Sequence, residues 1–176
     1  MQLILAEPEL QYEKEFSVMV MDFFHHHELK RYELFKPGIE DFSKYVQSKL
    51  KEAKGIDLPP GFVKCSTYWL TDESKTIYGT IRYRPVIEGN EYFKRIGGHI
   101  GYDIAPSHRK KGLATIMLLM MLQRIDRHEN DSIMIGCSEN NTGSMRVIEN
   151  NGGIFESMQF DARNNRTVKV YRIHLK

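Results

Sequence analysis

Residues 97–122 constrain the fold most, because an extended apolar run meets a basic turn there and then enters a helix. The segment reads GGHIGYDIAPSHRKKGLATIMLLMML. Pro106 stops the predicted strand, and the helix begins after Gly112. A helix N-terminus carries unpaired backbone N–H groups and a partial positive charge, so this order predicts a phosphate or pyrophosphate site. Gly112 would let the backbone approach the anion, and the small side chain of Ala114 keeps the first turn uncrowded.

Apolar residues recur at spacings of three and four in two N-terminal segments, one after Pro8 and one after Pro37. Both segments are predicted to be amphipathic helices. Two extended runs around the polar turn 72–75 predict a β-hairpin, and alternation in its second arm indicates a strand with one buried face. Further along, the sequence predicts strands at 97–104, 133–137, 153–160 and 167–175, and helices at 112–128 and 142–150.

An antiparallel set of strands that later interleaves with helices predicts an α/β fold. We expect a mixed, mostly antiparallel central sheet with helices on both faces. A length of 176 residues fits a single domain spanning residues 1–176. A monomer and a homodimer are both compatible with this length.

Charge and composition exclude several classes of partner. The formal net charge is +2, from 25 basic and 23 acidic residues spread along the chain, so neither nucleic acid nor a membrane is expected as a partner. The longest apolar run, 113–122, is about half of what a bilayer span requires. Cys65 and Cys137 are too few for a disulfide framework, and the acidic N-terminus does not resemble a signal peptide. These observations predict a cytoplasmic protein.

The basic turn also carries a family resemblance. Arg109-Lys110-Lys111-Gly112-Leu113-Ala114 resembles the Arg/Gln-x-x-Gly-x-Gly/Ala motif of the GNAT superfamily of N-acetyltransferases, which follows a strand and opens a helix. The resemblance implies a GNAT-like fold and acetyl-CoA as the acyl donor. It implies that backbone amides hold the coenzyme A pyrophosphate and that the preceding strand flanks the pantetheine arm. The implied pyrophosphate residues are Arg109, Lys110, Lys111, Gly112, Leu113, Ala114 and Thr115, and the implied strand residues are Tyr102, Asp103 and Ile104.

A second strand–turn–helix segment at 133–153 supports the resemblance. It reads IMIGCSENNTGSMRVIENNGG, in which Asn141 and Ser144 match family positions near the pantetheine arm. Asn141 can equally act as the cap of the helix that begins at Thr142. More narrowly, residues 62–153 are similar to a bacterial group of predicted GNAT acetyltransferases without assigned substrates.

Acetyl transfer to an amine requires a neutral nitrogen, and therefore a base or a water chain. The resemblance implies a base on the strand before the turn, where His99 stands; its ordinary pKa is about 6.5. A backbone N–H near Tyr102 or Asp103 is the expected oxyanion donor. The position of the family's acid tyrosine holds Ile148, so Tyr102, Cys137, a water or unassisted departure of the thiolate remain open.

The function predicted from these features is an acetyl-CoA-dependent N-acetyltransferase acting on a primary amine of a small molecule or peptide. A non-catalytic acyl-CoA sensor is the alternative, motivated by Ile148. No metal is expected, because the adjacent histidines 25–27 would point about 100° apart on a helix. Arg82 and Arg84 share one face of the hairpin and either meet an acidic substrate or face solvent.

Overall fold

Two antiparallel β-sheets organise the chain in the computed structural model, which describes residues 2–175. The first has the strand order β1-β2-β3-β4 and the second has the order β5-β7-β6. The strands are β1 (Ile4–Ala6), β2 (Ser66–Thr71), β3 (Ile77–Tyr83), β4 (Ile100–Ile104), β5 (Ser132–Ser138), β6 (Ile154–Asp161) and β7 (Arg166–His174). The α-helices are α1 (Glu13–His25), α2 (Leu29–Phe35), α3 (Pro37–Glu40), α4 (Phe42–Lys54), α5 (Leu113–Arg124) and α6 (Thr142–Asn150). Two 3₁₀ turns, η1 (Leu10–Tyr12) and η3 (Pro106–His108), and one π-helical turn, η2 (Phe93–Gly97), complete the chain.

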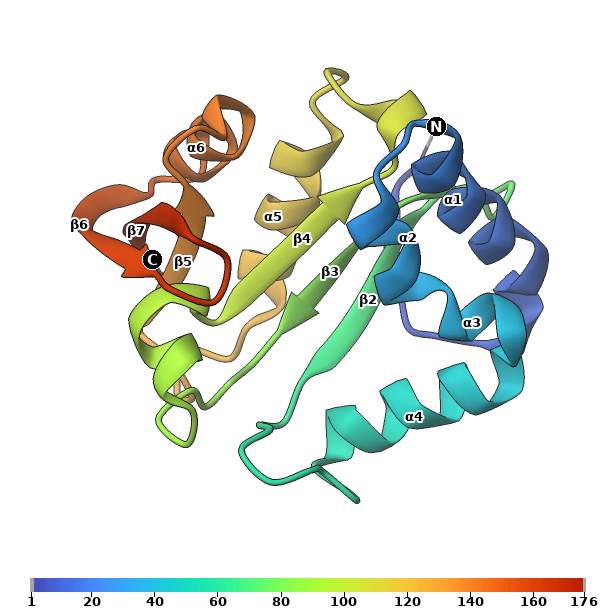
Figure 1. Cartoon of the computed structure of the whole chain (residues 1–176), viewed down its shortest axis with the longest axis horizontal. Helices are drawn as coiled ribbons and strands as arrows, with labels where there is room; N and C mark the ends of the chain where they lie inside the picture. The colour runs from blue at the N-terminus through green and yellow to red at the C-terminus, as the bar shows by residue number, and fades with distance from the viewer. Residues whose placement is uncertain (1, 176) are drawn as a thin grey trace.

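The N-terminal helices cover one face of the first sheet (Figure 1). Trp69 of β2 is fully buried there. The centre of its ring lies 5.4 Å from that of Phe16 in α1 and 6.1 Å from that of Phe42 in α4. The Asp41 side chain caps α4 by accepting from the Lys44 amide at 2.9 Å. The sequence did not predict α2, since only Phe35 of its seven residues is buried and no apolar period marks it.

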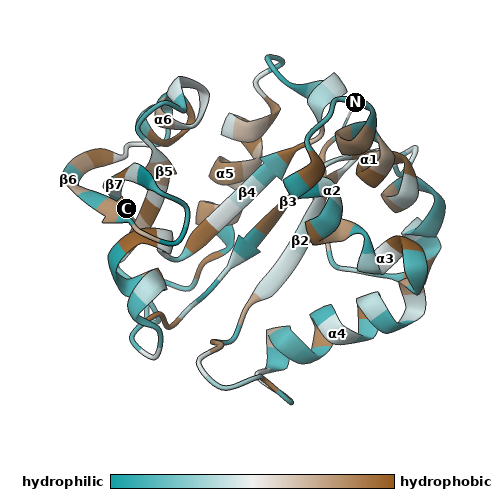
Figure 2. Ribbon diagram, in the orientation of Figure 1, coloured by the Kyte–Doolittle hydropathy of each residue, from teal (hydrophilic) through white to brown (hydrophobic). Residues whose placement is uncertain are grey.

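Helix α5 covers the opposite face of the same sheet. Met117 and Leu118 are fully buried and belong to one apolar cluster with Ile81 and Ile100. Hydrophobic colouring dominates α5 whereas α4 is mainly hydrophilic (Figure 2). Because helices cover both faces, every residue of β3 except Arg82 is buried, and the expectation of one buried face was wrong. The predicted mixed α/β fold with helices on both faces is confirmed.

Within residues 2–175, one β-bridge, between Gly98 and Ile135, joins the two sheets. Gly98 has φ +65°, and a Cβ there would collide with the Met134 carbonyl oxygen, so a side chain does not fit at this junction. The predicted strand at 97–104 therefore begins only at Ile100, after η2. Beyond the bridge no ladder joins β4 to β5 within residues 2–175, and the two strands separate (Figure 1). Among these residues no helix combines the length and hydropathy needed to cross a bilayer.

Candidate active site

The turn between η3 and α5 exposes backbone N–H groups. Gly112 is the N-cap residue of α5 with φ +76°, and no side chain in the described part of the chain caps this helix. The first intrahelical bond of α5 runs from the Ile116 amide to the Gly112 carbonyl, so the amides of Leu113, Ala114 and Thr115 lack intrahelical acceptors. A Cβ at Gly112 would meet no atom within 4 Å, so the helix end is open to a ligand.

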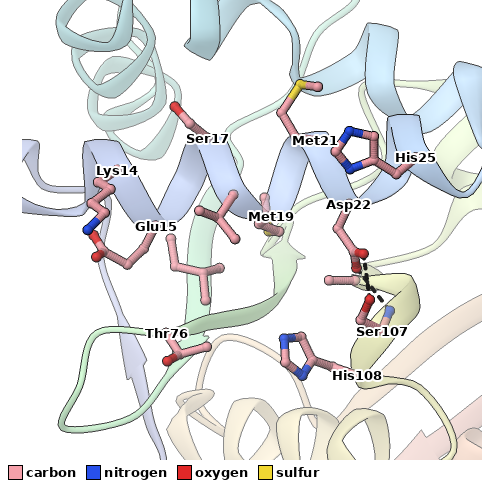
Figure 3. Close-up of a pocket in the computed structure, with 13 residues that line it drawn as sticks. Lys14, Glu15, Ser17, Met19, Met21, Asp22, His25, Thr76, Ser107 and His108 are labelled. Carbon is pink, nitrogen blue, oxygen red and sulfur yellow. Dashed lines mark hydrogen bonds between the residues drawn. The ribbon is translucent and has the colours of Figure 1, made fainter.

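Side chains from the N-terminal helices fix this turn in place. The Arg109 guanidinium donates to both carboxylate oxygens of Glu28, and its Nε donates to the Ile104 carbonyl at 3.0 Å. The hydrogen bond from Arg109 holds the pKa of Glu28 below its ordinary value. Ser107 donates from its amide and its hydroxyl to Asp22, at 2.9 and 2.6 Å (Figure 3). The Arg109 side chain is thus engaged within the protein, and Lys111 Nζ donates to the Ser107 carbonyl at 3.1 Å, which leaves Lys110 and the backbone to face an anion.

A cavity of about 210 Å³ opens where β4 and β5 separate. Its walls come from β3, β4, β5, η2, α2, α6 and β7. The cavity is lined by Arg31, Arg82, Arg84, Tyr92, Phe93, Ile96, Gly97, Ile100, Gly101, Tyr102, Ile135, Gly136, Cys137, Ser138, Asn141, Ser144, Arg166 and Val168. Three predicted site residues, Tyr102, Asn141 and Ser144, therefore lie together.

Tyr102 and Ser144 form a hydroxyl pair in this cavity, with 2.7 Å between their oxygens. Burial raises the pKa of Tyr102 to about 12, so its hydroxyl stays protonated at neutral pH. Burial likewise raises the pKa of the nearby Cys137 thiol, which keeps it neutral. The pair can donate a proton but does not act as a base.

The pairing of β4 with β3 fixes the direction of the Tyr102 amide. The Arg84 amide donates to the His99 carbonyl, and the Ala105 amide donates to the Tyr78 carbonyl. These bonds make the intervening odd-numbered residues of β4 the hydrogen-bonded partners of β3. The Tyr102 N–H therefore points away from β3, toward the side where β5 diverges, whereas the Asp103 N–H points toward β3.

Asn141 caps helix α6, and Ile148 packs in the core. The Asn141 side chain accepts from the Ser144 amide at 3.0 Å, which is the capping role expected for it. Ile148 is fully buried in the main apolar cluster, and a Cβ at Gly153 would collide with its carbonyl oxygen and its Cγ2. The position of the family's acid tyrosine thus serves the core in this chain.

His99 is buried against Met134 of β5 and does not line the cavity. Only 6% of the residue is exposed, and its Nδ1 accepts a hydrogen bond from the Met134 amide at 3.0 Å. Burial lowers the pKa of His99 below its ordinary value, with smaller opposing effects from Glu88 and from Met134. The structure therefore does not bring the expected base together with Tyr102 and Ser144.

Replacing His99 by leucine is expected to lower the free energy of unfolding by about 1–3 kcal/mol, because the Met134 N–H is left buried without an acceptor. The unfolded His99 binds a proton more readily than the folded one, so wild-type stability should fall as pH drops below about 6.5. Denaturant unfolding between pH 5 and 8 should show a smaller slope in the variant. A pH–rate inflection present in the wild type and lost in the variant would instead identify His99 as the base.

A larger cavity, of about 600 Å³, lies between α1, the start of β3 and η3 (Figure 3). Val18, Met19 and Met21 line it on one side and His108 on the other. It contains none of the residues predicted for the site. We therefore place the chemistry in the smaller cavity.

Residues 4–154 match the family model described as an acetyltransferase (GNAT) domain. The chain belongs to the GNAT acetyltransferase family. This assignment confirms the predicted family and the predicted enzyme class, an acyltransferase. No curated protein is significantly similar to the chain.

Solved GNAT structures share the fold at low sequence identity. The microcin C7 self-immunity acetyltransferase MccE, in complex with acetyl-CoA and AMP, has a TM-score of 0.71 and 14% identity, covering 98% of this chain and 92% of its own. The L7/L12 N-terminal serine acetyltransferase from Salmonella typhimurium has a TM-score of 0.67 and 14% identity, with 100% and 96% coverage. RimL in complex with coenzyme A has a TM-score of 0.68 and 15% identity, with 99% and 95% coverage. These similarities confirm the GNAT fold.

The sequence did not identify two arginines of the GNAT cavity. Arg31 comes from the unpredicted helix α2, and Arg166 comes from the first residue of β7. Neither stands in a recognisable motif, and no local periodicity relates them to β4. In residues 2–175 no three His, Cys, Asp or Glu side chains are grouped as a metal site.

Proposed function

We propose that this GNAT protein transfers an acetyl group from acetyl-CoA to a primary amine of a small molecule or a peptide. The observation that carries the proposal is the open N-terminus of α5, which follows β4, together with a cavity on β4 that contains the Tyr102 and Ser144 hydroxyls. Acetyl-CoA and coenzyme A in the MccE and RimL structures support the choice of donor. In this proposal, amides of residues 110–115 hold the pyrophosphate, since the Arg109 amide donates to the Pro106 carbonyl. Residues 102–104 flank the pantetheine arm, with Asn141 and Ser144 opposite.

The proposed chemistry is attack of a neutral amine on the thioester carbonyl. Because the Tyr102 N–H points toward the β5 side, we assign it, rather than the Asp103 N–H, as the donor to the developing oxyanion. The carbon–sulfur bond then breaks, and the Tyr102–Ser144 pair supplies a proton to the departing thiolate. No Asp, Glu or His stands among the residues that line the cavity in the described range, so the amine's proton leaves through solvent.

Calorimetry of the full chain with acetyl-CoA, followed by thiol release with a panel of primary amines and peptides, tests this function. Binding together with amine-dependent thiol release is the expected result. Absence of binding at millimolar acetyl-CoA would overturn the donor assignment. We do not favour the acyl-CoA sensor, because the Tyr102 and Ser144 hydroxyls stand in the cavity although Ile148 replaces the acid tyrosine. Binding without turnover of any amine would restore that alternative.

Tyr102→Phe is expected to lower kcat about tenfold and to leave the Kd for acetyl-CoA within about twofold of wild type. The effect is modest for an acid, because a thiolate with an ordinary pKa near 8.5 is a good leaving group. Steady-state thiol release and calorimetry measure the two quantities. Tyr68→Phe is the matched control, since Tyr68 lies on β2 outside the cavity. An unchanged kcat in Tyr102→Phe would remove the hydroxyl pair from the mechanism.

A further inference from the structure

Four guanidinium groups line the cavity, and among the described residues only two carboxylates pair with them. Asp103 receives Arg31 Nε at 2.6 Å and Arg82 Nη2 at 2.8 Å. Asp161 receives Arg166 Nε at 3.2 Å. The cavity wall therefore carries an excess of positive charge.

Arg84 is the guanidinium that the protein leaves available. No carboxylate of residues 2–175 lies within ion-pair distance of it, and its charged group stacks 4.0 Å from the centre of the Phe93 ring. The side chain is half-buried, and burial lowers its pKa. A cation withdrawn from water without a counter-charge favours an anionic ligand.

Arg82 and Arg84 converge on one point of β4. Their guanidinium nitrogens lie 3.7 and 3.9 Å from the position that a Cβ of Gly101 would occupy. Arg82 Nε is buried and has no hydrogen-bond partner in the described chain. Two adjacent guanidinium groups and an unpaired N–H donor over a glycine form a site for an oxyanion.

This site is separate from the pyrophosphate turn. The oxyanion site lies over Gly101, near the start of β4, whereas the turn follows the end of β4 and η3. From Gly101 to Ile104 the strand rises roughly 10 Å, so one pyrophosphate cannot occupy both places. The cavity, about 210 Å³, is smaller than the roughly 300 Å³ at which pockets for drug-sized ligands begin, so the group it holds is small.

We propose that the acceptor amine carries a small oxyanion, a carboxylate or a phosphate, which Arg84 and Arg82 bind over Gly101. The proposal rests on the acetyltransferase function proposed above and specifies its substrate class. Arg84 is a specificity residue in this account: it attracts the acidic acceptor and does not take part in donor binding.

Matched acceptor pairs test the proposal: β-alanine against β-alanine amide, and O-phosphoethanolamine against ethanolamine. In thiol-release assays the acidic member should have a kcat/KM at least about tenfold higher in the wild type. In Arg84→Gln this ratio should fall to within about twofold, while the Kd for acetyl-CoA is unchanged. Comparison of the two pairs separates a carboxylate preference from a phosphate preference. Arg95→Gln removes the same charge from η2 without altering the cavity lining and should keep the wild-type ratio.

Equal use of neutral and acidic amines by an enzyme that binds acetyl-CoA would overturn this proposal and leave the acetyltransferase function standing. Failure to bind acetyl-CoA would overturn the function itself. Where no amine of the panel is acetylated, calorimetry with succinate and with inorganic phosphate at saturating acetyl-CoA decides the matter. Binding of either anion by the wild type, weakened at least about fivefold in Arg84→Gln, supports the site. No binding of either anion overturns it.

Discussion

Gly112→Asp is expected to raise the Kd for acetyl-CoA about 100-fold. The new carboxylate would stand at the open end of α5, where the pyrophosphate is proposed to bind. Two like charges about 4 Å apart repel by about 4 kcal/mol at an effective dielectric constant of 20. Solvent and salt at this exposed turn reduce the repulsion to about 2–3 kcal/mol, which corresponds to roughly 100-fold in Kd. Isothermal titration with acetyl-CoA measures the effect.

Two control variants separate charge from backbone strain. Gly112 has φ +76°, a conformation that asparagine and aspartate tolerate better than other side chains, so Gly112→Asn keeps the shape without the charge. Gly55→Asp places the same change at another glycine with φ +74° and no neighbour within 4 Å. Both controls should bind acetyl-CoA within about fivefold of wild type. Equal weakening in the Asp and Asn variants at residue 112 would show that charge is not the cause.

Gly136→Ala is expected to lower the free energy of unfolding by about 3 kcal/mol or more. Gly136 lines the cavity on β5, and a Cβ there would lie well inside van der Waals contact of the Ile96 carbonyl oxygen. The obstacle is backbone of η2 rather than a flexible side chain, so either β5 or η2 must move. Thermal unfolding should show a drop in Tm of roughly 6–12 °C.

The matched control for this substitution is Gly89→Ala. A Cβ at Gly89 would meet only Val63 Cγ1, at an ordinary 3.6 Å, and its stability should change by less than about 0.5 kcal/mol. Retained stability in Gly136→Ala would mean that η2 is not held against β5. Loss of stability in both variants would point to a general sensitivity of the η2 region rather than to this close approach.

The sequence predicted the features that depend on local backbone. The strand–turn–helix order around Gly112, the cap at Asn141 and the helix that follows it were all predicted, because caps and turns depend on a few adjacent residues. The GNAT family followed from the same short segments. Predictions about faces were weaker: β3 was expected to bury one side, and the structure covers both.

The binding partners of individual side chains could be assigned only from the tertiary structure. The motif assigned only the backbone amide of Arg109 to the pyrophosphate turn and did not reveal that its guanidinium binds Glu28, which precedes it by 81 residues. His99 occupies the predicted strand region, yet its ring accepts from Met134 rather than entering the cavity. Alternation along a strand indicates which side chains are buried only when one face of the sheet is buried and the other is exposed. Here both faces of the sheet are covered.

The sequence by itself thus determined the family, the mixed α/β fold and the strand–turn–helix order at Gly112, since these rest on periodicity and on residues that are neighbours in the chain. Only the tertiary structure decided which charges surround the cavity. Arg31, Arg84 and Arg166 come from three distant elements, and their meeting depends on long-range packing that no local pattern records. The excess of guanidinium groups over carboxylates depends on this packing, and the inference of an acidic acceptor depends on that excess.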